Sequence, residues 1–352
     1  VLTGAGGFTG AHVLRHLLVN TDWQIICPVT FRHRGNSDRI SSALLGNDAW
    51  HRRVLVDMVD LTAPISTTVA HRWGQVDYIL NIASESHVDR SIDDPVPFVR
   101  NNVDLILNVL EYARQVKPRL VLQMSTDEVF GPAPGSYDYR EWDPLVPSNP
   151  YSASKAAQES IAISYWRAYA VPLIITNTMN LFGEMQHPEK YFAKIIRCIQ
   201  RGESVPVHVG ENGEMGSRFY IHARNFADAW LHLIRIYDDP VYAQRVVYTD
   251  GSEGDMRVPM YPLGDDRPAR YNIVGDREVG NLELAELIAS HVGKPLNWEP
   301  VNFHSSRPGH DLRYALNGEK LAATGWKSPK TFEDSVADTV RWMLANPEWS
   351  KE

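Results

Sequence analysis

The chain has 352 residues and a net charge of −8, with 43% hydrophobic and 22% charged residues. This length is enough for one large or two medium-sized domains with a substantial core. The acidic balance argues against a nucleic-acid groove or an anionic membrane surface as a partner, and no apolar run approaches the roughly 18 residues of a membrane span. The two cysteines, Cys27 and Cys198, fit neither a disulfide framework nor a cysteine-rich zinc site, which favours a reducing compartment and a cytoplasmic location.

Short apolar runs alternate with helix-like stretches over the first half, a pattern typical of βαβ units and a parallel sheet. Because the first run begins at Val1, we expect a few residues to precede it. The predicted strands are Val1–Thr3, Gln24–Cys27, Arg53–Asp57, Tyr78–Asn81, Leu120–Met124 and Leu173–Thr176. The predicted helices of this half are Ala11–Val19, Val96–Gln115 and Tyr151–Tyr169.

The alternation breaks up past Met179. Amphipathic segments predict further helices at Tyr191–Arg201, Phe226–Ile236 and Leu282–Val292. Between the last two, Gly251–Arg270 is polar and rich in Gly and Pro without a clear period, which indicates either an excursion loop or a partly mobile segment.

Three glycines follow the first predicted strand and open a helix: Gly4, Gly7 and Gly10 in the spacing G-x-x-G-x-x-G. Glycines let the backbone turn tightly and approach a pyrophosphate, which the N-terminus of the helix then stabilises. Glycines are common in ordinary turns, so the strand–loop–helix context carries the prediction of a dinucleotide site. The spacing resembles that of the short-chain dehydrogenase/reductase superfamily. That likeness implies cofactor contacts from Phe8, Thr9, Asp60, Leu61, Ile82, Ala83, Ser84 and Asn101.

The second predicted strand does not end in the acid that usually binds the adenosine ribose of NAD. Val29 or Thr30 takes that place, and Arg32, His33 and Arg34 follow. Arginines can bind the 2′-phosphate of NADP, whereas an acid would repel it. NAD and NADP therefore both stay open, and the alternative reading of these basic residues is a solvated loop.

Tyr151 and Lys155 lie four residues apart on a predicted helix and so on one face. A tyrosine ordinarily titrates near ~10, too high for a base at neutral pH. A lysine ammonium and an oxidised nicotinamide nearby would favour the phenolate and let Tyr151 accept a hydroxyl proton. Alone, this spacing also fits an ordinary amphipathic helix with a buried tyrosine. The catalytic reading depends on the glycine-rich loop and the strand pattern before it.

Asp127 and Glu128 stand side by side in "STDEVFG", directly after the apolar run of a predicted strand. Neighbouring side chains on a regular strand point to opposite faces. We therefore expect the strand to end before this pair, so that the following turn can aim both carboxylates into one cleft with Tyr151.

With these motifs, the chain resembles the extended short-chain dehydrogenase/reductases and, among them, the dTDP-glucose 4,6-dehydratase family. The likeness covers nearly the whole length. Its motifs are "ESHVDRSI" (Glu85–Ile92), "STDEVFG" (Ser125–Gly131), "PYSASKA", "HPEK" (His187–Lys190) and "RPGHDLRYA" (Arg307–Ala315). The departures are Ser306 for the usual aspartate, Asn101 for a threonine, Leu181 for a second asparagine, the missing second-strand acid and a longer segment at Gly251–Arg270.

The resemblance implies a reaction for the adjacent acids. Tyr151 would deprotonate the C4 hydroxyl of a nucleotide-linked hexose while hydride passes to the nicotinamide. Glu128 would then remove the acidified C5 proton, and a protonated Asp127 would donate to the departing C6 hydroxyl. Hydride returns to C6 and Glu128 returns a proton to C5. Thr126 would hydrogen-bond near the C4 oxygen, and two carboxylates in one pocket suit one acid and one base.

The resemblance also implies a substrate, a division of the chain and a dimer. The substrate contacts would come from Ser86, Thr126, Asn180, Lys190, Tyr191, Arg218, Asn272, Arg307 and His310. The predicted fold is α/β: a Rossmann-type doubly wound parallel sheet with a smaller C-terminal α/β substrate domain. The dinucleotide domain would span residues 1–178, with segments near 219–237 and 271–275 returning to it, and residues 179–352 would mostly bind the nucleotide sugar. A homodimer formed partly by the Tyr151 helix is expected.

Several alternatives stay open. The nucleotide can be dTDP, UDP, CDP or GDP, and the chain can instead be a sugar 4-epimerase or a decarboxylase. Those reactions need no elimination acid or C5 base, so Asp127 and Glu128 favour the dehydratase. A non-catalytic cofactor-binding protein of this fold is disfavoured because Thr126, Tyr151 and Lys155 are also present. The thirteen histidines are scattered without metal-ligand spacing, which predicts no metal site.

Overall fold

The computed structural model describes residues 1–32, 34–210, 213–239, 244–247, 253–256, 266–302 and 312–350. Its centre is a parallel sheet in which β5 lies between β4 and β12, and β3 pairs with β4. Residues 1–3 join the β1–β2 pair to this sheet, because the Leu2 amide donates to Ile26 O (2.8 Å) and the Thr3 amide to Leu80 O (3.0 Å). The strands are β1 (Ile25–Val29), β2 (Val54–Met58), β3 (Tyr78–Asn81), β4 (Leu120–Thr126), β5 (Leu173–Thr178) and β12 (Ala269–Ile273).

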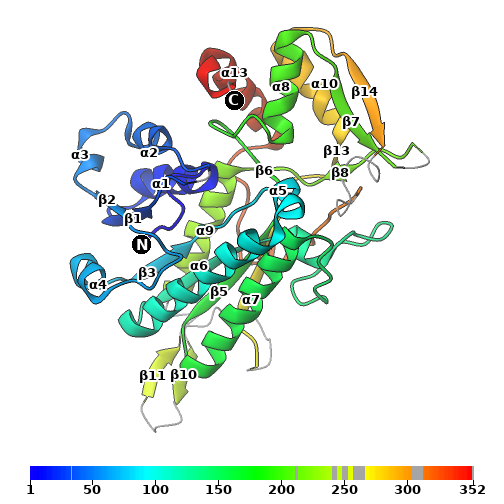
Figure 1. The fold of residues 1–352 in the computed structure, drawn as a ribbon. Helices are drawn as coiled ribbons and strands as arrows, with labels where there is room; N and C mark the ends of the chain where they lie inside the picture. Colours follow the sequence, from blue (N-terminus) through cyan, green and yellow to red (C-terminus); the bar gives the residue numbers. More distant parts are fainter. Residues whose placement is uncertain are drawn as a thin grey trace.

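Helices cover both faces of the sheet (Figure 1). On one face α1 (Phe8–Asn20) packs against α9 (Ala223–Asp238), and on the other α6 (Pro95–Val116) packs against α7 (Pro150–Tyr169). The strand side chains divide accordingly: Leu122 belongs to the core under α1, and its neighbour Val121 to the core under α6. This alternation is the period of a strand buried on both faces. The remaining helices of this half are α2 (Ser37–Leu44), α3 (Asp48–His51), α4 (Thr67–Trp73), α5 (Val88–Asp93) and the 3-10 turn η1 (Asp127–Phe130).

A separate hydrophobic core holds the C-terminal lobe together at the top of Figure 1. Helices α8 (Tyr191–Arg201), α10 (Asn281–Val292) and α13 (Phe332–Ala345) contribute to this core together with β7 (Val205–Val209), which pairs with β14 (Trp298–Asn302). The fold is therefore α/β, with a doubly wound parallel sheet and a smaller C-terminal lobe, as predicted. The other elements are β6 (Leu181–Phe182) paired with β9 (Ile221–His222), β8 (Ser217–Arg218) paired with β13 (Val279–Gly280), α12 (Glu319–Ala323) and η3 (Pro347–Ser350).

The segment Gly251–Arg270 differs from the expected irregular excursion where it is described. β11 (Glu253–Met256) pairs antiparallel with β10 (Gln244–Val247), and β12 already begins at Ala269. Residues 257–265 lie outside the described ranges. Side chains of α9 and β12 belong to the same core cluster as those of α1. The domain boundary near residue 178 stays a prediction.

Candidate active site

A cavity of about 300 Å³ opens at the carboxyl edge of the parallel sheet. Ligands of doubly wound folds bind at this edge, and the volume lies at the lower end for small-molecule sites. The loops after β1, β2 and β3 reach it, and Met124 and Ser125 line it from the end of β4, whereas Thr126, Asp127 and Glu128 are not among its lining residues. All fifteen residues predicted for the cofactor line it: Gly4, Gly7, Phe8, Thr9, Gly10, Arg32, Arg34, Asp60, Leu61, Ile82, Ala83, Ser84, Asn101, Tyr151 and Lys155.

The glycine-rich loop has the geometry that a dinucleotide requires. Gly4 has a φ of +72°, which favours glycine. A Cβ on Gly10 would lie 2.1 Å from Gly4 O, so no side chain fits there. Gly7 precedes the first turn of α1 and lines the cavity. The loop therefore brings backbone and the positive end of a 13-residue helix to the cavity wall, which suits a pyrophosphate.

Acidic partners hold two arginines of the cavity lining, Arg32 and Arg34. Arg32 pairs with Asp60 after β2 (2.6 Å), and Arg34 pairs with Glu189 (2.7 Å). Partial burial works against ionisation of Asp60, but hydrogen bonds from Thr62 and the charge of Arg32 outweigh it, so the pKa of Asp60 is lowered. The positive charges of Arg32 and Arg34 in the loop after β1 are thus balanced by Asp60 and Glu189, which belong to two other segments of the chain.

The acid pair lies just beyond the end of β4, as predicted. The strand ends at Thr126, and η1 begins at Asp127. Thr126 Oγ1 donates to Asp127 Oδ1 (2.8 Å) and accepts a long hydrogen bond from the Glu128 amide (3.4 Å). Both carboxylates therefore project from a tight turn. The alternation of side chains between the two faces of a strand does not apply there, so it does not separate them.

Asp127 is the more buried of the two acids, with 3% of its surface exposed. Burial raises the pKa of Asp127 to about 6, although the Thr126 hydrogen bond and the charge of Arg218 act in the opposite direction. Its Oδ2 is buried and has no hydrogen-bond partner within the described part of the chain. A buried carboxyl that keeps its proton in mildly acidic solution, with one oxygen left over, is suited to general acid catalysis.

Glu128 is held from the helix that carries Tyr151. Asn149 donates from Nδ2 to Glu128 Oε2 (3.2 Å), and Asn149 also caps α7 by accepting the Ser152 amide (2.9 Å). The helix cap therefore links the base candidate to the first turn of α7, where Tyr151 lies.

Tyr151 is nearly fully buried and lines the cavity. Burial raises the pKa of Tyr151, and the charges of Glu128 and Asp127 raise it further against a hydrogen bond with Thr126. The protein's own groups therefore favour the neutral phenol, and a lowering of the pKa of Tyr151 by Lys155 together with an oxidised nicotinamide stays a prediction. These influences also show that Thr126, Asp127, Glu128 and Tyr151 are close neighbours.

Lys155 is buried and lines the cavity. Its Nζ donates to Met124 O (2.8 Å) and to Gln158 Oε1 (2.6 Å). Burial lowers the pKa of Lys155 to about 7. Neutral carbonyl oxygens are thus its hydrogen-bond partners in the described structure.

The predicted sugar contacts lie in different surroundings. Ser86 and Lys190 line the cavity, and Lys190 Nζ donates to Ser86 O (2.9 Å). Asn180 follows β5, the neighbour of β4, and its buried Oδ1 has no hydrogen-bond partner among the residues that the structure describes. Tyr191 begins α8 and donates to Asn281 O (3.3 Å) in the C-terminal lobe. Arg307 and His310 lie outside the described residues.

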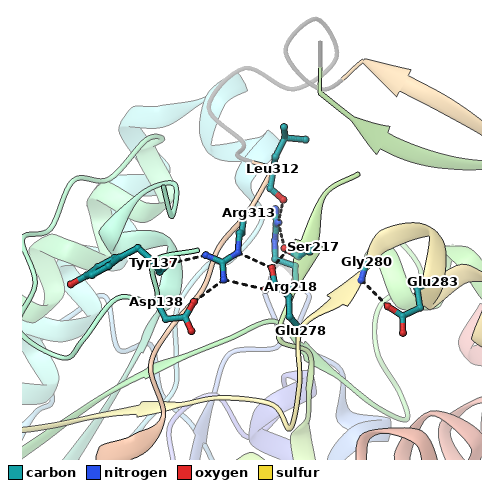
Figure 2. A network of polar contacts seen from close by, with 9 residues as sticks. All are labelled: Tyr137, Asp138, Ser217, Arg218, Glu278, Gly280, Glu283, Leu312 and Arg313. Atoms are coloured by element: carbon teal, nitrogen blue, oxygen red, sulfur yellow. Dashed lines mark hydrogen bonds and ion pairs between the residues drawn. The ribbon is translucent and has the colours of Figure 1, made fainter. Parts of the chain in front are cut away.

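Arg218 lies in a polar network beside the lobe (Figure 2). It donates to Ser217 O (2.6 Å) and to Leu312 O, and its guanidinium stacks over the Tyr314 ring at 4.6 Å. Figure 2 also shows Arg313, which joins Asp138 in the loop after η1 to Glu278 (2.7 and 2.8 Å). Since the charge of Arg218 acts on Asp127, Arg218 belongs near the acid pair.

Asn272 lies inside the fold. Its side chain is fully buried in β12, where Nδ2 donates to Tyr139 O (2.9 Å) and Asn317 O (3.1 Å). Its buried Oδ1 has no hydrogen-bond partner within the described ranges. The predicted contact of Asn272 with the substrate stays a prediction.

Residue-by-residue prediction missed several groups on the cavity wall. Gln186, His187 and Glu189 line it, and so do Ser125 and Arg39. The motif "HPEK" was the available signal for His187 and Glu189, and Gln186 directly precedes it. Ser125 precedes the acid pair, and its buried Oγ has no partner in the described ranges. Arg39 is buried on α2 and donates to Met185 O (3.1 Å), a contact that no local pattern reveals.

The comparisons with known proteins agree with this geometry. The model of the NAD dependent epimerase/dehydratase family matches residues 1–246. The chain belongs to this family. It is 33% identical over 348 residues to the low-salt glycan biosynthesis protein Agl12 of Haloferax volcanii, covering 99% of each protein. It is 30% identical to the dTDP-glucose 4,6-dehydratase of Salmonella typhimurium, covering 99% of this chain and 93% of that one.

Solved structures of the family extend the likeness to the fold. DesIV, a dTDP-glucose 4,6-dehydratase from Streptomyces venezuelae crystallised with NAD, superposes with a TM-score of 0.80 at 28% identity and covers 99% of this chain and 97% of its own. The family resemblance drawn from the sequence motifs is confirmed. No helix among the described ranges is long and apolar enough to cross a membrane. Within the same ranges, no cluster of three or more His, Cys, Asp or Glu residues has a metal-binding arrangement.

Proposed function

We propose that the chain is a nucleotide-hexose 4,6-dehydratase that converts dTDP-glucose to dTDP-4-keto-6-deoxyglucose. The observation that carries this proposal is the placement of Asp127 and Glu128 on η1 beside Tyr151, with Asp127 protonated up to a pH of about 6. An elimination needs an acid for the leaving hydroxyl and a base for the neighbouring proton. Relatives at about 30% identity are dTDP-glucose 4,6-dehydratases, which supports the same nucleotide sugar here.

NAD is the cofactor that we propose. The glycine cradle and the helix end fit a dinucleotide, and the structural relatives DesIV and the Bacillus anthracis dehydratase were crystallised with NAD. NADP has less support, because Asp60 and Glu189 already pair with the arginines that would bind its 2′-phosphate. The bound nicotinamide would supply the acceptor and donor of hydride. Gly4, Gly7 and Gly10 would hold the pyrophosphate, and Tyr151 with Lys155 would face the nicotinamide ribose.

The chain's own groups would move the protons. Tyr151 Oη would take the proton of the C4 hydroxyl, with Thr126 hydrogen-bonded to it. Glu128 would remove the C5 proton, held in place by the Asn149 amide at 3.2 Å. Asp127 would protonate the leaving C6 hydroxyl from its buried oxygen. The unpartnered Oδ2 of Asp127 and Oδ1 of Asn180, at the ends of neighbouring strands, are available to hydrogen-bond a sugar.

A panel of nucleotide hexoses tests this function. The protein is incubated with dTDP-, UDP-, CDP- and GDP-glucose, with an N-acetylated analogue and with a nucleotide-linked uronic acid, and mass spectrometry follows the loss of one water or of carbon dioxide. We expect loss from dTDP-glucose first. Stereochemical inversion at C4 without water loss would instead support an epimerase, and release of carbon dioxide from a uronic acid would support a decarboxylase. A homodimer and a cytoplasmic location stay predictions.

A further inference from the structure

Gln158 lies one turn after Lys155 on α7 and is fully buried. Its Oε1 accepts from Lys155 Nζ (2.6 Å), and its Nε2 donates to Asn102 O in α6 (2.7 Å). The opposite orientation of the amide would place its NH₂ against the lysine ammonium and its oxygen against a carbonyl. The two neighbours therefore fix which end of Gln158 faces Lys155.

Gln158 is also the last member of a buried chain of side chains that crosses the sheet. Thr3 Oγ1 donates to Asn81 Oδ1 (2.7 Å), Asn81 Nδ2 to Gln123 Oε1 (2.7 Å), and Gln123 Nε2 to Gln158 Oε1 (3.3 Å). At its other end, Thr3 Oγ1 accepts the amides of Ile82 and Ala83 (both 3.0 Å), which line the cavity. Fully bonded buried networks of this kind hold their members in one arrangement.

The Lys155 ammonium has two hydrogen-bond acceptors in the described structure, and only one of them can be altered by substituting a side chain. Met124 O belongs to the backbone of β4 and is fixed by the sheet. Gln158 Oε1 is a side-chain acceptor and is set by the network. Together they use two of the three N–H groups of the ammonium, which leaves one donor for the cavity side of Lys155.

We propose that Gln158 is a positioning residue that holds Lys155 as an ammonium at the cavity wall. This inference rests on the proposed function, in which a charged Lys155 assists Tyr151. Carbonyl oxygens stabilise the charged form of a buried amine, whereas burial alone penalises it. Titratable side chains on its own helix α7 include Tyr151 and the buried Glu159, which pairs with Arg270. Of the elements packed against α7, η1 carries Asp127 and Glu128, and α5 carries Asp89, Arg90 and Asp93. The adjoining parts of β4 and α6 present the uncharged Met124, Ser125, Asn101 and Asn102.

Direct titration of Lys155 tests the inference without any sugar. The protein is isotope-labelled at the lysine Cε, the Lys155 signal is assigned with Lys155→Arg, and its chemical shift is followed with pH. Gln158→Leu removes the acceptor at similar volume and should lower the titration midpoint by about one pH unit, the scale of one lost charge-assisted hydrogen bond. Gln158→Glu supplies a negative acceptor and should raise it.

Asn81→Leu is the matched control, because Asn81 belongs to the same network without contacting Lys155 or Gln158. It should leave the Lys155 midpoint within a few tenths of a unit. An unchanged midpoint in folded Gln158→Leu, or an equal shift in Asn81→Leu, would overturn the inference. In turnover assays, the pH above which kcat declines should move with the Lys155 midpoint. If no nucleotide hexose loses water, the proposed function fails while the titration still decides the role of Gln158.

Discussion

The two sides of the cleft are assembled in different ways. The fifteen residues predicted for the cofactor follow consecutive parallel strands and the first turns of two helices, and they all lie within the first 155 positions of the chain. The proposed sugar side would draw on Ser86, the end of β4, Asn180, Lys190 and Arg218, which come from both lobes. The first side is thus formed mainly at a sheet edge, with Gln186, His187 and Glu189 added to its wall, whereas the second depends on how the C-terminal lobe packs against the sheet. Tyr151 stands where the two sides meet, so substitutions there and on either side should separate binding from chemistry.

Tyr151→Phe should have the largest effect on turnover. Removing the hydroxyl deletes the group that accepts the C4 proton. A general base typically contributes about 10²- to 10⁴-fold to the rate, and turnover should fall by a factor in this range. Cofactor binding should persist, because the glycine loop and Lys155 are unchanged. We would measure water loss from the sugar and, separately, the dissociation constant of NAD. Equal losses of both would mean that Tyr151 maintains the cofactor side instead of joining the two.

Asp127→Asn should affect the sugar side alone. The amide cannot protonate the leaving hydroxyl, so dehydration should fall by about 10²- to 10³-fold, within the usual range for one acid. Oxidation at C4 should continue and appear as ultraviolet absorbance of the reduced nicotinamide. Glu128→Gln is the companion variant, since it should block removal of the C5 proton and show the same absorbance. Dehydration at the unsubstituted rate in Asp127→Asn would contradict the assignment of the acid.

The same contrast explains what the sequence could predict. The glycine loop, the strand ends and the break before Asp127 follow from local spacing, and the cavity contains every predicted cofactor residue. The surroundings of Asn272 could not be predicted in the same way, because its burial and its hydrogen bonds to Tyr139 and Asn317 depend on the pairing of β12 with β5 and on loops distant in sequence. The protonation states also depend on packing. The Y-x-x-x-K spacing cannot show that Lys155 is paired with Gln158 and Met124, or that neighbouring carboxylates raise the pKa of Tyr151.

The pH dependence should show which side of the cleft limits the reaction. Asp127 must carry a proton to act as the acid, and with its pKa raised to about 6 that proton is present below this pH and lost above it. Lys155 must be charged, and with its pKa lowered to about 7 its charge is lost above that value. The ratio kcat/KM reports the free enzyme and should therefore fall about tenfold per pH unit above 6 and more steeply above 7. In Asp127→Asn, the residual activity should begin to fall only near the second value. A flat profile across both values would contradict these roles.

The smallest predicted effect concerns the ion pair at the mouth of the cofactor side. Arg34 and Glu189 meet at 2.7 Å with half of the arginine side chain exposed, and such exposed pairs typically contribute only about 0.2–1 kcal/mol. Glu189→Gln leaves Arg34 without this carboxylate, which should make it a better partner for a 2′-phosphate. We expect the ratio of NADP to NAD affinity, measured by calorimetry, to rise about two- to fivefold, the factor that corresponds to this energy. Glu203→Gln is the control: it breaks a longer exposed pair, at 3.8 Å, with Arg201 at the end of α8 and should leave the ratio unchanged. No change in Glu189→Gln would mean that Arg34 does not face the 2′ position of the cofactor.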